Sequence, residues 1–258
     1  MSLPEILAMR EETASGFRTT IPDEWLQGRT AYGGLSAALA YEGAKAADVD
    51  LPPLRSAQVS FIGPLSGEVE ISARLMRRGR NAAFVAAEVS GEKGVGTSAM
   101  FVFMSEIDSH VSHSEGGPPQ VAPPQPLAEG TAPLGSAPGF IRNFDMTGFE
   151  SFEAQGAADV VRWFRLKDRR GIDPMTELVL IGDGLPPAAM TLMRERVNIS
   201  SLTWLYNVLA PPETSDGWWL LRAESDHAEH GASSQDMSVW NADGDLVARG
   251  MQSVALFG

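Results

Sequence analysis

Hydrophobic and polar residues alternate in several stretches of this chain, which predicts a protein rich in antiparallel strands. The clearest stretch is 68–75 (EVEISARL), where Val69, Ile71, Ala73 and Leu75 share one face, as in a strand with one buried side. Comparable patterns predict further strands in both halves of the chain. They cover 54–63, 67–77, 81–90 and 95–104 in the first half, and 139–147, 159–167, 193–208, 217–228, 231–240 and 246–257 in the second.

Two apolar segments break the alternation and are predicted to be helices. Residues 33–47 are rich in small side chains, which would let a curved sheet approach the helix closely. The second segment, near 174–185, is apolar on nearly all sides, as expected of a buried helix. It starts at Asp173-Pro174, a pair typical of a helix N-terminus. One helix followed by four antiparallel strands, occurring twice, predicts an α+β fold made of two similar units.

The two halves also end alike. GTSAMFVF (96–103) and ARGMQSVA (248–255) each close a half, and in this alignment Gln252 stands where the first half has Met100. We expect this exchange of an apolar for a polar residue to mark where the repeat has been adapted for function. Between the halves, 105–138 is rich in Pro, Gly and Ser, which is typical of an extended linker. This predicts an N-terminal domain at 1–107, a linker at 108–137 and a C-terminal domain at 138–258.

Composition narrows the classes of function. The net charge of −13 argues against nucleic acid and anionic membranes as general partners. The chain has no cysteine, so a disulfide, a thiolate nucleophile and a cysteine metal site are excluded. The start, MSLPEILAMREE, reaches acidic residues too early for a signal peptide, and no apolar run approaches the roughly 20 residues of a membrane-spanning helix. We therefore expect a soluble, cytoplasmic protein.

Four stretches of the sequence resemble the acyl-CoA thioesterase II-like family. The more specific parts are the Tyr-Gly-Gly entry to the first helix and the last strand with its embedded glutamine. The resemblance implies a double hotdog fold, in which two repeats each wrap an antiparallel sheet around a long central helix. It also implies a homodimer. The matching stretches are 28–46, 54–89, 178–190 and 247–257.

The same resemblance implies hydrolysis of a fatty acyl-CoA thioester without metal or organic cofactor. Members of the family are described as using a carboxylate, a hydroxyl and a glutamine from the second half to hold and activate water. Carried over by position, the glutamine is Gln252, the hydroxyl position holds Asp226 and the carboxylate position holds Ser200. A carboxylate and a hydroxyl are thus exchanged, and the set Asp226, Gln252 and Ser200 still contains an acid, a hydroxyl and an amide.

The Tyr32-Gly33-Gly34 sequence is a candidate substrate-binding element. Backbone N–H groups at a helix start are unpaired, and the helix dipole favours negative charge there. Glycine would let a thioester carbonyl approach these groups, which would then form an oxyanion hole. The alternative is that the two glycines only permit a tight strand-to-helix turn.

Each candidate side chain also has a simpler interpretation. Asp226 would be the general base, or instead a surface carboxylate on a polar strand end. Gln252 would orient the water, or instead be an exposed glutamine on an edge strand. Ser200 could bind the base or the water, although serines are common in strands. Asp183, inside an apolar stretch, is interpreted as a satisfied structural acid or as an acid of raised pKa facing the acyl channel.

Other chemistries find less support in the sequence. His227 and His230 are three residues apart, which places them on opposite faces of a strand and argues against a shared metal. A hotdog hydratase would need a His soon after Asp173, and none follows. The basic run 77–80 could meet CoA phosphates or form a solvated turn. The rival hypothesis is a non-catalytic acyl-CoA or lipid-binding protein that kept the pocket.

Overall fold

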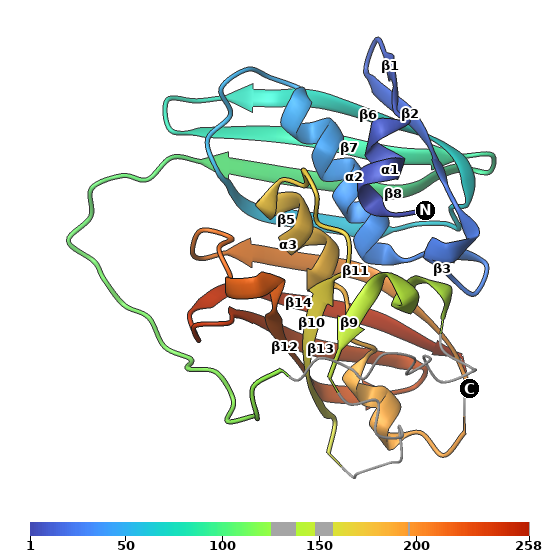
Figure 1. The fold of residues 1–258 in the computed structure, drawn as a ribbon, viewed down its shortest axis with the longest axis vertical. Helices are drawn as coiled ribbons and strands as arrows, with labels where there is room; N and C mark the ends of the chain where they lie inside the picture. The colour runs from blue at the N-terminus through green and yellow to red at the C-terminus, as the bar shows by residue number, and fades with distance from the viewer. Residues whose placement is uncertain (125–137, 148–156, 196, 258) are drawn as a thin grey trace.

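The computed structural model describes residues 1–124, 138–147, 157–195 and 197–257, which form one strongly curved antiparallel sheet around two helices (Figure 1). The sheet has twelve strands in the order β1-β2-β6-β7-β8-β5-β11-β14-β13-β12-β10-β9. The order of β6, β7, β8 and β5 is mirrored by β12, β13, β14 and β11. The two predicted units are therefore present, and their strands join into one continuous sheet.

The first half carries α1 and α2 and eight of the strands. A short α1 (Leu3–Ala8) precedes β1 (Glu11–Thr13) and β2 (Gly16–Ile21), and a small ribbon of β3 (Leu26–Gln27) and β4 (Thr30–Ala31) leads into α2 (Gly33–Ala46). The large strands follow as β5 (Leu54–Phe61), β6 (Gly67–Arg78), β7 (Ala82–Gly91) and β8 (Gly94–Met104).

The second half repeats this layout with a shorter helix. It contains β9 (Phe144–Met146), β10 (Asp159–Leu166), α3 (Pro174–Gly182), β11 (Asn198–Val208), β12 (Trp219–Glu229), β13 (Ala232–Asn241) and β14 (Leu246–Phe257). Short 3₁₀ helices lie at Asp23–Trp25, Gly139–Asn143, Ala188–Leu192 and Ser215–Gly217. The halves join where β5 pairs with β11, from Ser60 opposite Thr203 to Ser56 opposite Asn207.

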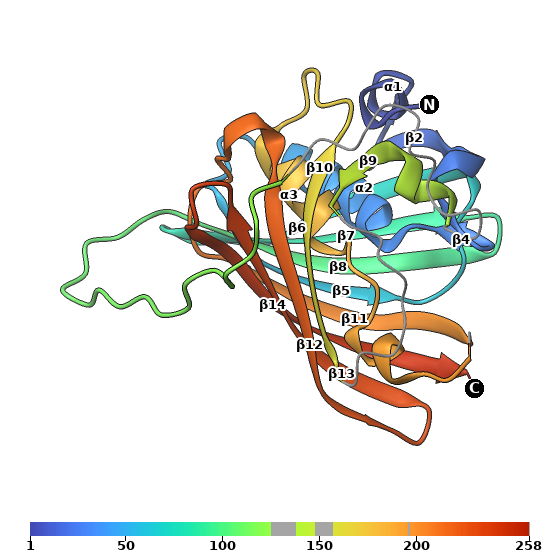
Figure 2. The same cartoon turned by 60° about the horizontal axis from the view of Figure 1, so that its bottom comes forward.

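Both helices lie on the concave side of the sheet and pack against each other (Figures 1 and 2). They run in opposite directions, because the start of α2 meets the end of α3 while Glu42 near the end of α2 meets Thr176 near the start of α3. The small side chains of α2 permit this close packing, and most of the helix is buried. Burial of apolar surface by both halves in a single core stabilises the joined sheet.

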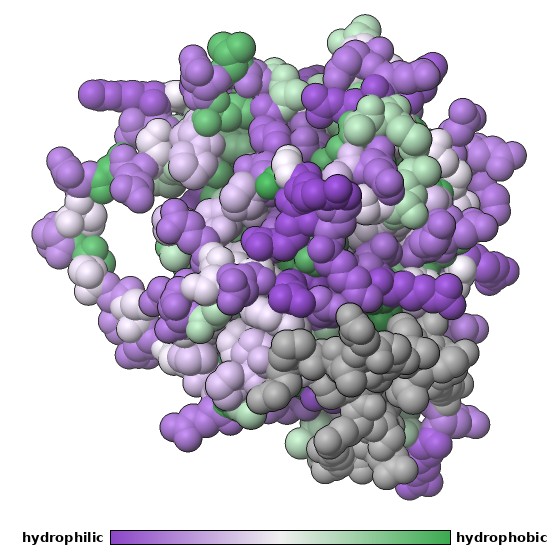
Figure 3. Space-filling view, viewed as in Figure 1, coloured by the Kyte–Doolittle hydropathy of each residue, from purple (hydrophilic) through white to green (hydrophobic). Residues whose placement is uncertain are grey.

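The described part of the linker is held against the sheet at two points. The indole nitrogens of Trp163 and Trp240 donate to the carbonyls of Ala122 and Gly116, both at 2.9 Å. These tryptophans form a small second cluster with Trp218 and Leu220. Between these points and β8 the chain stands away from the body, as the loop at the left of Figure 3 shows. The predicted linker residues 125–137 lie outside the described part of the chain.

Three sequence predictions need correction. The strand expected at 139–147 begins with a 3₁₀ helix at Gly139–Asn143, and only Phe144–Met146 is a strand. The helix predicted near 174–185 ends at Gly182, so Asp183 caps it rather than lying inside it. The strand expected at 193–208 starts at Asn198.

The alignment of Met100 with Gln252 is also wrong, because the two residues lie on opposite faces of the sheet. Met100 lies between the buried residues Ala99 and Phe101 and opposite the exposed Gln58, so it faces outward, whereas Gln252 is buried. Successive residues of a strand point to opposite faces, so a slip of one residue exchanges the two sides of the sheet. Gln252 still lies on the inner face, which is the side of the helices.

None of the described helices is long and apolar enough to cross a membrane.

Candidate functional site

A cavity of about 940 Å³ lies beside the N-terminus of α2 and the C-terminus of α3. Its walls come from both halves of the chain, and most of the side chains that line it are apolar. Its polar groups include Asp183, Ser200 and Ser201, and Gly33 lines it with its backbone. The apolar side chains in the wall include Phe61, Phe140, Ile141, Met146, Val160 and Phe164.

Asp183 is a buried carboxylate in the wall of this cavity. It caps the C-terminus of α3 and exposes 9% of its surface. The Nε2 of Gln252 on β14 donates to its Oδ1 at 2.7 Å, and the backbone N–H of Gly34 donates to the same carboxylate. A β-carbon built on Gly33 would lie 2.5 Å from its Oδ2. The carboxylate is therefore in direct contact with the first turn of α2.

A second buried glutamine continues the network from Gln252. Gln235 on β13 lies opposite Gln252 in the sheet, and its Nε2 donates to Gln252 Oε1 at 2.7 Å. The Gln235 Oε1 accepts from the backbone N–H of Ala188 at 2.8 Å. Both glutamines are buried, with 0% and 2% of their surfaces exposed. Hydrogen bonds thus run from the Ala188 backbone through two amides to Asp183.

The surroundings of Asp183 change its proton affinity. Burial raises the pKa of Asp183 from 3.8 to about 7, against the opposite effect of the hydrogen bonds from Gln252 and Gly34. The C-terminal end of α3 also disfavours a negative charge, whereas the N-terminal end of α2 favours it. A carboxyl group with a pKa near neutrality can take up and release a proton at physiological pH, which is the property of a general base.

The start of α2 is shaped by its glycines and by Tyr32. A β-carbon on Gly34 would overlap the Leu180 carbonyl oxygen, so glycine permits the two helices to meet there. Tyr32 is buried, donates its hydroxyl to the Leu180 carbonyl at 2.6 Å and stacks on Phe140 at 4.2 Å. Tyr32 and Gly34 therefore fix the helix start. Gly33 lines the cavity directly.

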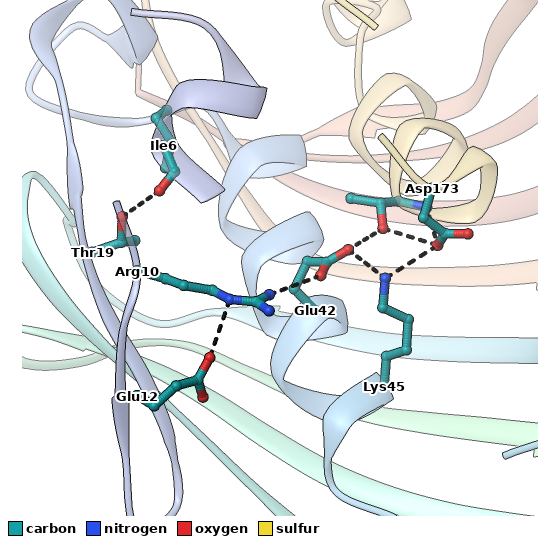
Figure 4. A network of polar contacts seen from close by, with 8 residues as sticks. Ile6, Arg10, Glu12, Thr19, Glu42, Lys45 and Asp173 are labelled. Atoms are coloured by element: carbon teal, nitrogen blue, oxygen red, sulfur yellow. Dashed lines mark hydrogen bonds and ion pairs between the residues drawn. The ribbon is translucent and has the colours of Figure 1, made fainter. Parts of the chain in front are cut away.

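The opposite end of the helix pair is closed by charged side chains (Figure 4). Glu42 of α2 accepts a hydrogen bond from Thr176 Oγ1 and forms an ion pair with Lys45 at 2.7 Å. Arg10 lies 3.8 Å from the other oxygen of Glu42. The Asp173 carboxylate accepts a hydrogen bond from the Thr176 backbone N–H at 3.2 Å and so caps the N-terminus of α3. These side chains bind one another, and none of them lines the cavity beside Asp183.

The three residues predicted to be catalytic lie in different environments. Gln252 is in the buried network, and Ser200 is exposed in the cavity wall, its hydroxyl donating to the Ser201 carbonyl at 3.3 Å. Asp226 is exposed at a bulge of β12 between Ser225 and His227, and it does not line the cavity. The structure thus brings Gln252 and Ser200 to the site that Gly33 lines, and leaves Asp226 on the surface.

Sequence reasoning missed Gln235 and gave Asp183 a secondary place. Gln235 belongs to the ASSQDMSV stretch, where it resembles any polar residue of a half-exposed strand. The sequence did indicate that Asp183 is unusual, because a buried carboxylate beside the apolar run of α3 is costly unless another group binds it. That partner is 69 residues away, so local pattern could not identify it.

The described residues contain no group of three or more His, Asp or Glu placed to hold a metal ion. The basic run at 77–80 is remote from the cavity wall, and Arg78 pairs with Asp48 at 2.7 Å.

The chain also matches two family models and several solved structures. The family model for the acyl-CoA thioesterase N-terminal domain matches residues 21–104, and the model for the C-terminal domain matches residues 117–256. No curated protein matches the chain in sequence.

Solved structures match nearly the whole chain. A conserved protein of unknown function with a hot dog fold from Alicyclobacillus acidocaldarius has a TM-score of 0.85 and 23% identity, over 98% of this chain and 97% of that one. The TesB protein of Mycobacterium avium subsp. paratuberculosis has a TM-score of 0.78 and 16% identity, over 100% of both chains. An acyl-CoA thioesterase II from Mycobacterium marinum has a TM-score of 0.74 and 17% identity, over 98% and 97%. The chain therefore has the hotdog fold.

Proposed function

Because the chain belongs to the acyl-CoA thioesterase family, we propose that it hydrolyses an acyl-CoA thioester to the free acid and CoA, using the cavity beside Asp183. The observation that carries this proposal is the position of the carboxylate. Asp183 lies in the wall of a mostly apolar cavity, next to a helix N-terminus, and burial raises its pKa to about 7. These are the parts that hydrolysis by activated water requires.

In this mechanism Asp183 is the general base. It takes a proton from a water molecule as that water attacks the thioester carbonyl carbon. The tetrahedral intermediate then collapses, the carbon–sulfur bond breaks, and the proton on Asp183 passes to the leaving thiolate. Gln252 donates to Oδ1 and so directs the other oxygen, Oδ2, toward Gly33 and the cavity.

The first turn of α2 stabilises the negative charge that forms on the carbonyl oxygen. The positive end of the helix dipole points toward the cavity, and Gly33 has no side chain to keep the thioester away. Ser200, which lines the same cavity, supplies a hydroxyl to the water or the substrate. The apolar wall formed by Phe61, Phe140 and Phe164 receives the acyl group.

The assignment of the base differs from the one carried over from the family. Asp226, which the sequence resemblance placed near the family's hydroxyl position, is exposed and outside the cavity wall. Asp183 is buried and contacts both Gln252 and α2. We therefore assign proton transfer to Asp183 and give Asp226 no part in the reaction.

Release of free thiol from a panel of saturated, branched and aromatic acyl-CoAs tests the proposed function. We expect turnover of at least one member of the panel. If no acyl-CoA is hydrolysed while acyl-CoA still raises the unfolding temperature, the chain is a binding protein and the proposal is wrong.

The homodimer is a proposal that rests on the family resemblance. Analytical ultracentrifugation tests it, and a mass of 27.6 kDa at micromolar concentration would contradict it.

A further inference from the structure

Gln235 is a fully buried glutamine outside the cavity wall, two hydrogen bonds away from Asp183. It exposes none of its surface, and both ends of its amide are paired. A buried amide that only filled space would cost free energy, since an apolar side chain of the same size would avoid its desolvation. Its presence therefore needs an explanation, which the order of donors and acceptors provides.

The orientation of the network is set at Ala188. This residue begins the 3₁₀ helix Ala188–Leu192 directly after Pro187, and its backbone N–H can only donate. Gln235 must therefore present Oε1 to Ala188, which turns its Nε2 toward Gln252. Gln252 must then present Oε1 to Gln235, which turns its Nε2 toward Asp183.

The reverse orientation of the Gln252 amide would change which of its atoms faces the Asp183 carboxylate. If the Gln252 amide were turned over, its Oε1 would face the Asp183 carboxylate, and two acceptors would be in contact. A carboxylate loses stability in such a contact, whereas a protonated carboxyl group can donate to it. The orientation of Gln252 thus selects between the ionised and the protonated form of Asp183.

We infer that Gln235 is a positioning residue, which holds the Gln252 amide with its N–H groups toward Asp183 and so keeps the Asp183 carboxylate available as a base. The inference rests on the proposed function, because it assigns Gln235 a part in that reaction. Gln235 touches neither the cavity wall nor Asp183, and it acts only through Gln252.

Few other ionisable groups face Asp183. From the N-terminus of α2 comes Tyr32, whose pKa burial and the nearby Asp183 raise well above 10. Tyr206 of β11 lies near Tyr32, and burial raises the pKa of Tyr206 as well. The charged groups in the cavity wall are Arg162, Arg194 and Glu195. Both phenols are neutral at pH 7, so the Gln252 amide is the main adjustable partner of the carboxylate.

A double-mutant cycle tests the inference. Gln235→Met and Gln252→Met are made singly and together, and kcat/KM for an acyl-CoA is measured from pH 5 to 9. We expect Gln235→Met to lower kcat/KM at pH 7 about tenfold and to move the acid limb of the profile to higher pH. Gln58→Met is the control, because Gln58 is an exposed glutamine of the same sheet. It should leave both quantities unchanged.

The cycle separates positioning from a structural contribution. If Gln235 acts through Gln252, the double variant is no slower than Gln252→Met alone. Independent losses that multiply in the double variant, or an unchanged acid limb in Gln235→Met, would overturn the inference. Should Gln235→Met fail to fold, Gln235→Asn is the second variant. Its amide is one methylene too short to reach both partners, and the same shift of the acid limb is expected.

A titration without substrate distinguishes failure of this inference from failure of the proposed function. The ¹³C chemical shift of the Asp183 carboxyl carbon reports its protonation directly. We expect its midpoint to be higher in Gln235→Met than in the wild type. If the wild type hydrolyses nothing but this midpoint moves, the proposed function fails and the positioning role stands. If the midpoint does not move, the positioning role is wrong whether or not the protein is an enzyme.

Discussion

At the scale of single residues, Asp183 is the clearest case of a side chain whose chemistry is set by its neighbours. It is an ordinary aspartate in sequence, yet burial between two helix ends raises its pKa to about 7. The donors Gln252 and Gly34 lower the pKa again, although by less than burial raises it. The group therefore exchanges its proton in the range where a hydrolase works.

The pH dependence of the reaction follows from this pKa. The ionised form of Asp183 is the active one, so kcat/KM should rise with pH and reach half of its plateau near pH 7. An ordinary aspartate would give a midpoint near 4. Initial rates of thiol release in buffers of constant ionic strength provide the measurement. A profile that is flat between pH 5 and 9 would contradict the role of Asp183.

The same shift affects stability with a defined sign. A carboxyl group whose pKa is higher in the folded state favours folding of its protonated form, so its contribution to stability declines as pH rises from about 4 to 7. The free energy of unfolding of Asp183→Asn relative to wild type should therefore increase over this interval. Urea unfolding at pH 4.5 and 7.5 measures it, and a relative stability that falls with pH would show that burial does not raise this pKa.

At the scale of elements, the start of α2 is the part that both halves build together. Gly33 and Gly34 leave room for Asp183 and for the Leu180 carbonyl, which belong to the other half. The N-cap residue Tyr32 makes no side-chain cap, and the Asp183 carboxylate accepts from the Gly34 N–H in its place. An acid from one repeat thus caps the helix of the other.

Gly33→Ala tests this junction. The added β-carbon would lie 2.5 Å from Asp183 Oδ2, so the carboxylate must move away from the helix start. We expect kcat/KM to fall by at least tenfold. Gly79→Ala is the matched control, since its β-carbon would lie no closer than 3.4 Å to its neighbour in an exposed turn. Unchanged rates in Gly33→Ala would mean that the reaction takes place elsewhere.

The elements themselves were largely predictable from the sequence, while their ends and contacts were not. The strand at 67–77 lies where the alternation of apolar and polar residues predicted it, because this pattern reports local structure. The helix expected at 33–47 from its small apolar residues is present as Gly33–Ala46. The bulges near Leu202 and Asp226 have no such pattern, since they arise from pairing between distant strands. Gln252 could be selected through the family resemblance of the last strand, but its bonds to Asp183 and Gln235 depend on the assembled sheet.

At the scale of the whole molecule, two similar halves have become unequal. An acid follows the first residue of each helix by nine residues, which is Glu42 within α2 and Asp183 at the C-terminal cap of α3. Asp183 faces a cavity and a glycine helix start, whereas Glu42 is bound by Thr176 and Lys45. The start of α3 has proline at its first position and is capped by Asp173. Among the described residues, the end of the helix pair beside Asp183 is therefore the end with a cavity for an acyl group.

This asymmetry predicts one binding site in each chain. Calorimetric titration with a thioether analogue of acyl-CoA, which cannot be hydrolysed, should give a stoichiometry of one. The value should stay the same in Glu42→Gln and Thr176→Val, because that end of the helix pair takes no part in binding. Two sites in a chain would show that the end containing Glu42 is open to ligand.

Thiol release by Asp183→Asn, measured beside the wild type and Asp226→Asn with one good acyl-CoA substrate at pH 8, tests the central claim most directly. Thermal unfolding first establishes that all three proteins are folded. We predict a loss of at least 100-fold in kcat for Asp183→Asn and a rate within about twofold of the wild type for Asp226→Asn. Full activity in Asp183→Asn together with loss of activity in Asp226→Asn would contradict the account and return the general base to Asp226.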